Sequence, residues 1–93
     1  MPRTKIGRLP EEQDTSLDEP YTTYDLGTAS ALLCSGFELL SLDKENPRKA
    51  LFIFKRESDI EEIANLYFGD RLEVRGRSFF DSLKALKNKL YSE

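Results

Sequence analysis

The sequence predicts a small α+β domain with the order α-β-β-α-β-α, a three-stranded mixed sheet and helices mainly on one face of it. Three observations lead to this prediction. Two apolar runs flank a polar, proline-containing break within residues 36–55, a pattern typical of a β-hairpin. Apolar residues recur at helical spacing in three other segments. The chain has 93 residues, which is the size of a single domain.

Composition limits the class of protein. Hydrophobic residues make up 39% of the chain and charged residues 33%, as expected for a globular domain with a soluble surface. No apolar run approaches the roughly 18 residues of a membrane-spanning helix, and the N-terminal residues lack the apolar core of a signal peptide. With a single cysteine, no disulfide forms within the chain. We therefore expect a cytoplasmic protein without a membrane partner.

The sequence offers little for catalysis. It contains no histidine, which is the usual general base and the commonest metal ligand. The glycine-rich phosphate loops, the zinc-binding spacings and the nucleophile motifs are absent. The one cysteine, Cys34, lies in a predicted helix without a flanking base and is interpreted as a small packed side chain. We expect no catalytic residues, no metal site and no cofactor, and hence no enzyme.

Charge changes along the chain. Residues 1–20 form a predicted flexible, charged N-terminal arm, basic at its start and acidic over residues 11–19, and residues 21–93 form the predicted domain. Residues 71–91 hold 6 basic and 2 acidic residues, a net charge of +4, on a chain whose net charge is −3. A cationic segment on an acidic protein can mark a contact with nucleic acid, although overall acidity argues against strong non-specific DNA binding.

The first predicted helix covers residues 23–35. Thr22 or Thr23 is the expected N-cap, with Asp25 in the first turn, and Gly36 lies where a C-cap glycine belongs. Apolar residues inside this segment recur every three or four positions and form one stripe, at Leu26, Ala29, Leu32 and Leu33.

The hairpin follows, with predicted strands at 37–42 and 50–55. Both runs are apolar at consecutive positions, whereas a sheet with one wet face alternates apolar and polar residues. Both faces therefore need cover, and a second copy of the chain is one way to supply it. The candidate self-association residues are Leu40, Leu42, Phe52 and Phe54.

Two more elements are predicted before the C-terminal helix. Ser58 and Glu61 form a capping box for a helix at 59–68, which ends at Gly69. Residues 70–75 then alternate charged and apolar side chains and predict a short edge strand. Together with the second hairpin strand, this helix and strand predict a right-handed βαβ unit.

The last predicted helix, 77–91, carries two stripes. The core stripe contains Phe79, Leu83, Leu86 and Leu90. Beside it, basic and aromatic residues alternate within an arc of roughly 80° on a helical projection. Three interpretations remain open: lysine stems that shield the core edge, a nucleic-acid surface, or a protein interface. The candidate nucleic-acid-binding residues are Arg75, Arg77, Lys84, Lys87 and Tyr91.

The order of these features resembles a known family. TTYDLGTASALLCSGFELLSLDKENPRKALFIF, a short helix and then RSFFDSLKALKNKLY are similar to a family of short prokaryotic and phage proteins catalogued as a domain of unknown function. The resemblance covers about residues 21–92. It implies a compact standalone module and supplies no activity or site.

These observations predict a non-enzymatic binding module. Its expected partner is nucleic acid or a nucleic-acid-associated protein, contacted through the basic and aromatic flank of the C-terminal helix. The alternative is a protein-interaction or homo-oligomeric module, such as a homodimer, that uses the apolar hairpin.

Overall fold

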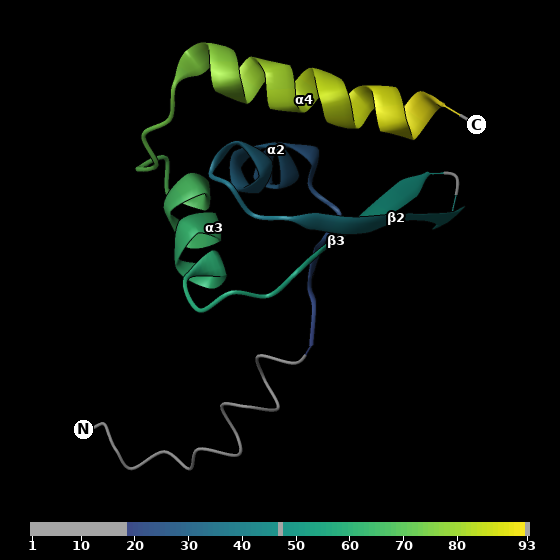
Figure 1. Cartoon of the computed structure of the whole chain (residues 1–93), viewed down its shortest axis with the longest axis horizontal. Coiled ribbons are helices and arrows are strands. Elements are labelled where there is room, and N and C mark those ends of the chain that lie inside the picture. Colours follow the sequence, from purple (N-terminus) through teal and green to yellow (C-terminus); the bar gives the residue numbers. More distant parts are fainter. Residues whose placement is uncertain (1–18, 47, 93) are drawn as a thin grey trace.

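The computed structural model describes residues 19–46 and 48–92. Its elements are β1 (Tyr21–Thr23), α2 (Leu26–Cys34), β2 (Leu39–Asn46), β3 (Lys49–Phe54), α3 (Ile60–Phe68) and α4 (Gly76–Tyr91). The predicted α+β class is confirmed: three helices in this part of the chain pack with one three-stranded sheet (Figure 1). The predicted arm at 1–20 lies outside the described residues except for Glu19 and Pro20.

The sheet is antiparallel throughout, with strand order β1-β3-β2. The predicted hairpin is confirmed as β2 and β3, but the predicted mixed sheet is wrong. The third strand is β1, which pairs Tyr21 with Phe54 and Thr23 with Phe52. The element order is therefore β-α-β-β-α-α in place of α-β-β-α-β-α.

Residues 70–75, predicted as an edge strand, form a loop between α3 and α4. They cannot pair with β3 as the predicted βαβ unit requires, because both edges of this central strand are already occupied by β1 and β2. The predicted βαβ crossover is consequently absent from the described residues. The segment begins at Asp70, a non-glycine residue with φ of 61°, which turns the chain at the end of α3.

The helix ends combine confirmed and corrected features. Asp25, expected in the first turn of α2, is its N-cap, and its carboxylate accepts hydrogen bonds from the Thr28 backbone N–H at 2.8 Å and the Thr28 hydroxyl at 2.7 Å. Thr22 and Thr23, predicted as caps, belong to β1. Gly36 has φ of 100° and ends α2 as predicted: the N–H of Phe37 bonds the carbonyl oxygen of Leu32 at 3.1 Å.

The helix predicted at 59–68 is confirmed as α3, and the helix predicted at 77–91 is confirmed as α4. The predicted capping box at the start of α3 is wrong. Asp59, not Ser58, precedes the first helical residue, and it makes no side-chain capping hydrogen bond.

A β-bulge changes which hairpin residues share a face. Leu39 pairs with Phe54 and Leu42 with Phe52, while the register shifts between Leu39 and Ser41, leaving Leu40 as the extra residue. Leu39 and Leu42 therefore lie on the same face as the two phenylalanines. Strict alternation along a regular strand would place Leu39 and Leu42 on opposite faces.

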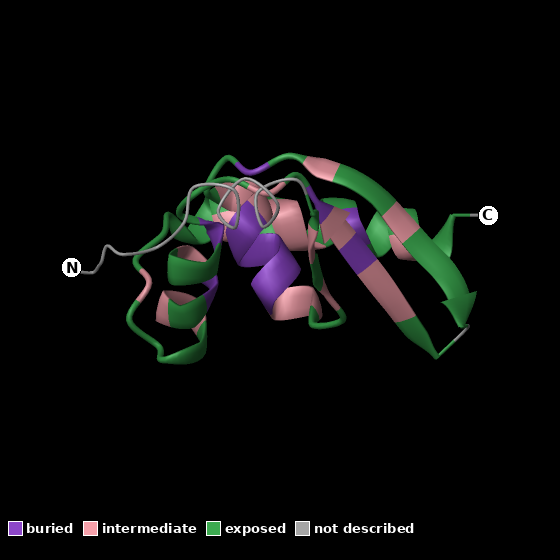
Figure 2. Ribbon diagram, turned by 90° about the horizontal axis from the view of Figure 1, so that it is seen from below, coloured by how far each residue is buried: buried purple, intermediate pink, exposed green. Residues whose placement is uncertain are grey.

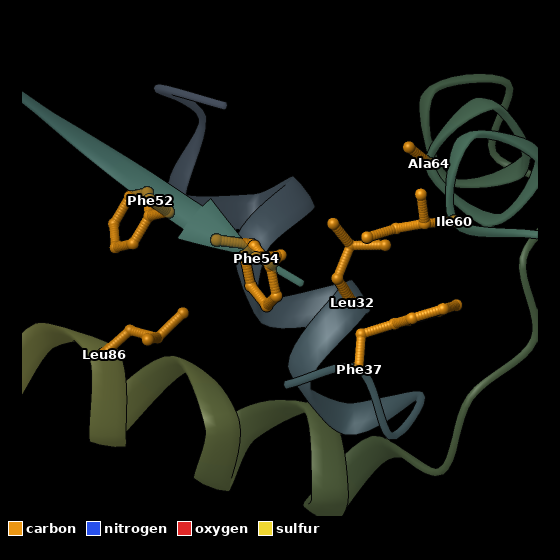
Figure 3. Close-up of a cluster of buried hydrophobic side chains, with 8 residues drawn as sticks. Leu32, Phe37, Phe52, Phe54, Ile60, Ala64 and Leu86 are labelled. Atoms are coloured by element: carbon orange, nitrogen blue, oxygen red, sulfur yellow. The ribbon is translucent and has the colours of Figure 1, made fainter. Parts of the chain in front are cut away.

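The core lies where the central strand meets the helices. Buried apolar side chains come from α2, β3, α3 and α4 and include Leu32, Phe52, Phe54, Ile60 and Leu86. Figure 3 shows Leu86 of α4 pointing toward Phe52 and Phe54, and Ile60 of α3 pointing toward Leu32. The buried residues concentrate along α2 and the second half of β3 (Figure 2). This packing places α4 against α2, with its C-terminal end beside the hairpin, and leaves the other side of the helix in solvent (Figure 1).

Candidate nucleic-acid interface

The candidate interface is one flank of α4. Because Gly76–Tyr91 is a single uninterrupted helix, residues three and four positions apart lie on the same side of it. This spacing brings together five exposed residues, which we call the basic-aromatic flank: Arg77, Phe80, Lys84, Lys87 and Tyr91. From its first to its last residue the flank runs about 21 Å along the helix axis.

The core packing of α4 holds this flank outward. Leu86 is fully buried, and Phe79, Leu83 and Leu90 are half-buried on the side that meets the rest of the domain. On the flank, by contrast, Phe80 is 55% exposed and Tyr91 79% exposed. Large aromatic residues with this much exposure offer ring faces to a partner, and the neighbouring lysines supply positive charge.

Lys84 lies over one of the two exposed rings of the flank. Its ammonium nitrogen is 5.6 Å from the centre of the Phe80 ring, a contact in keeping with the shielding interpretation. Lys84 itself is exposed. Tyr91 has no cation over its ring among the residues that the structure describes. The two ends of the flank therefore differ, with one ring partly covered and the other open.

Four of the five predicted nucleic-acid-binding residues share this flank. The fifth, Arg75, lies immediately before α4 in extended conformation, with φ of −74° and ψ of 129°. It is exposed at the helix N-terminus, next to the start of the flank and not on it.

A hollow lies at the other end of the flank, where α4 ends beside the tip of the hairpin. Its volume is about 430 Å³. Its lining comes from both elements and consists of Lys44, Asn46, Arg48, Ala50, Leu90 and Tyr91. Lys44 and Arg48 are absent from the candidate residues that the sequence indicated. Strand alternation does not identify them, because Arg48 lies in the turn before β3 and the β2–β3 register shifts between Asp43 and Asn46. The position of the hairpin beside the end of α4 was also not visible in the sequence.

Charges at the hairpin tip are sorted by face. Lys44 and Arg48 line the hollow beside α4. Asp43 and Glu45 line a smaller depression, together with Tyr24, Lys49, Leu51 and Asn46, the last of which also lines the hollow. The side of the hairpin that continues the basic-aromatic flank is therefore the more positive one.

The predicted self-association residues do not form one surface. Phe52 and Phe54 are 1% and 0% exposed and belong to the core, and Leu42 is half-buried. Leu40, the bulge residue, is 51% exposed. Of the four, Leu40 is thus the residue with substantial surface for a partner.

Other reactive groups are few in the described residues. Burial raises the pKa of the Cys34 thiol, and a hydrogen bond with the Ser35 side chain lowers it by less. No group of three carboxylate or thiol side chains is placed to hold a metal ion within 19–46 and 48–92. In the same ranges, α2, α3 and α4 lack the length and apolar composition that a bilayer-spanning helix needs.

Comparison with known proteins identifies the family and nothing finer. No curated protein and no solved structure shows significant similarity to the chain. One family profile, described as a domain of unknown function (DUF5659), matches residues 18–92. This match includes every described element of the fold and the whole basic-aromatic flank. The chain therefore belongs to the DUF5659 family of domains of unknown function.

Proposed function

We propose that this protein is a non-enzymatic module that binds nucleic acid through the basic-aromatic flank of α4. The observation that carries the proposal is the joint exposure of three cationic residues and two aromatic rings on one side of a helix whose adjacent side is anchored in the core. Positive side chains attract the phosphate backbone, and exposed rings stack on bases.

The charge distribution supports the same proposal. Between Gly76 and Ser92 the described residues include one acidic side chain, Asp81, against four basic ones. On a helical projection Asp81 lies beside Arg77 and Lys84, whereas Lys87 and Tyr91 have no carboxylate three or four positions away within α4. An acidic protein with one local cationic surface is suited to a confined contact with a nucleic acid, not to wrapping by it.

The experiment compares two double variants with equal changes in net charge. Lys84→Glu with Lys87→Glu reverses the flank, and Lys49→Glu with Lys55→Glu reverses two exposed lysines outside it. We expect the flank variant to abolish binding of a fluorescent oligonucleotide at low salt and the control variant to retain most of it. Equal losses would mean that net charge alone drives binding, and no binding by the wild-type protein would refute the proposal.

A second candidate function is association between copies through the outer face of the sheet. Tyr24 is 59% exposed beside Leu51, which is half-buried like Ile53, and the bulge residue Leu40 is 51% exposed. This alternative predicts a dimer by light scattering at micromolar concentration, which Leu40→Glu converts to a monomer. A wild-type monomer throughout that concentration range would exclude it.

A further inference from the structure

We infer that the hollow between the hairpin tip and the end of α4 holds one nucleotide of a single strand, with its base stacked on Tyr91 and its phosphate held by Arg48. This inference rests on the proposed function and specifies its partner as single-stranded nucleic acid. Tyr91 belongs both to the basic-aromatic flank and to the lining of the hollow, so a strand bound along the flank reaches the hollow directly.

The size and lining of the hollow suit a base. Its volume of about 430 Å³ falls in the range of roughly 300–1,000 Å³ that is usual for small-ligand sites. Leu90 and Ala50 supply apolar surface. The amide oxygen of Asn46 accepts a hydrogen bond from the Arg48 backbone N–H at 2.9 Å, so Asn46 offers its NH2 group as a donor to a base edge. Tyr91 has an exposed ring at this hollow, which is the arrangement needed for stacking.

The charge at the hollow depends on Lys44. The C-terminal end of a helix carries partial negative charge, which would repel a phosphate. The Lys44 ammonium group donates to the carbonyl oxygens of Lys89 at 3.2 Å, Leu90 at 3.4 Å and Ser92 at 2.7 Å. Lys44 thereby offsets the partial negative charge at the C-terminal end of α4, and its ammonium group faces the carbonyl oxygens of that helix.

Arg48 is then the cation at the hollow that is available for a phosphate. Its side chain is exposed, and the one ion pair in residues 19–46 and 48–92 joins Arg56 to Glu61, away from this site. Lys87 lies one helical turn before Tyr91 on the same flank and offers the next positive charge along the strand.

The geometry favours a single strand over a duplex. Bases in a duplex are stacked on one another, so none is free to enter a hollow or to lie on an aromatic ring. An unpaired strand offers both a ring face and a flexible backbone that can follow the flank into the hollow. The inferred ligand is therefore single-stranded DNA or RNA, which the experiment separates.

The test measures affinity by anisotropy with unstructured deoxythymidine and uridine oligonucleotides of about 12 bases and with a duplex of the same length. We expect the single strands to bind more tightly than the duplex. We expect Tyr91→Ala to weaken single-strand binding by about 5- to 100-fold, and Tyr91→Phe to keep most of it. Arg48→Glu should weaken binding and flatten its salt dependence, while Lys49→Glu, on the opposite face of the hairpin, should change little.

A spectroscopic readout tests stacking directly. The chain has no tryptophan, so Tyr91→Trp introduces a single one, whose fluorescence we expect the oligonucleotide to quench. Tyr24→Trp, at an exposed site that does not line the hollow, should be unaffected. If the wild-type protein binds and the Lys84 and Lys87 variant does not, yet Tyr91→Ala and Arg48→Glu bind normally, the nucleotide site is refuted and the proposed function stands. If the wild-type protein binds no oligonucleotide at low salt, both are refuted.

Discussion

The ammonium nitrogen of Lys44, near the end of β2, lies 2.7 Å from the backbone carbonyl oxygen of Ser92, just beyond the last residue of α4. The same nitrogen also donates to the carbonyls of Lys89 and Leu90. One side chain thus joins the hairpin to the C-terminal helix across 48 positions of sequence. This contact orients the two elements whose junction forms the hollow.

Removing this contact should loosen the end of α4. Lys44→Met keeps most of the apolar stem and removes the charge that faces the helix carbonyls. We expect the free energy of unfolding to fall by about 0.3–1 kcal/mol, the usual size of a favourable charge at a helix C-terminus. Urea denaturation measures the change, with Lys49→Met on the other face of the hairpin as the control. Equal effects of the two substitutions would show that the Lys44 contact does not stabilise the fold.

The two phenylalanines Phe52 and Phe80 should behave oppositely. Phe52 is 1% exposed and packs between β3 and the helices, so Phe52→Ala should lower the free energy of unfolding by about 3–5 kcal/mol. Phe80 is more than half exposed, so Phe80→Ala should change the free energy of unfolding by less than about 0.5 kcal/mol. The same substitution should weaken nucleic-acid binding. A large loss of stability from Phe80→Ala would mean that this ring is structural.

Gly27 should resist replacement although it lies in a helix. Alanine is usually about 1 kcal/mol more favourable than glycine inside a helix. Here an added Cβ would meet the Tyr67 hydroxyl oxygen, and the Tyr67 ring is stacked on Phe79 with 6.3 Å between centroids. We expect Gly27→Ala to lower the free energy of unfolding by about 1–3 kcal/mol.

A second substitution checks the cause of that loss. Tyr67→Phe removes the hydroxyl oxygen that the Cβ added by Gly27→Ala would meet. Combined with Gly27→Ala, it should therefore restore part of the lost stability, whereas on its own it should not stabilise the wild-type protein. Thermal or urea denaturation of the four proteins provides the measurement. A gain of stability from Gly27→Ala alone would show that Tyr67 moves aside freely.

The Cys34 thiol should react slowly near neutral pH. Desolvation by burial raises its pKa above the ordinary value, and the thiolate is the reactive form. The pKa of the Cys34 thiol is therefore higher in the folded protein than in the unfolded chain. The contribution of this thiol to folding stability is complete below the unfolded-state pKa, and it is lost as pH rises through the folded-state pKa. Modification by a thiol reagent should be slower in the native protein than in urea, with a rate profile displaced to higher pH. Equal profiles in both conditions would contradict the assigned burial.

Local sequence signals predicted the helices and the hairpin because each depends on its own residues. The apolar stripe of α4 and the glycine at position 36 identified these features without knowledge of their neighbours. The flank was predictable for the same reason, since helical periodicity alone places Lys84, Lys87 and Tyr91 together.

The errors concern features that depend on contacts between distant segments. β1 has three residues, Tyr21–Thr23, and its two threonines also suit a helix cap, so its pairing with β3 was not visible locally. The alternating residues 70–75 do not pair with β3 as predicted, because β1 and β2 already occupy both of its edges. The bulge at Leu40 shifts the facing of Leu42, and the hollow requires the hairpin and α4 to be placed side by side.

The salt dependence of single-strand binding by the wild-type protein tests the proposed nucleic-acid interface most directly. Contacts from Arg77, Lys84, Lys87 and Arg48 correspond to three or four neutralised phosphates. The logarithm of the association constant should therefore fall with the logarithm of salt concentration with a slope of about −2 to −3 between roughly 50 and 200 mM salt. Absence of binding at the lowest salt concentration, or an affinity that does not change with salt, would contradict the proposed nucleic-acid interface.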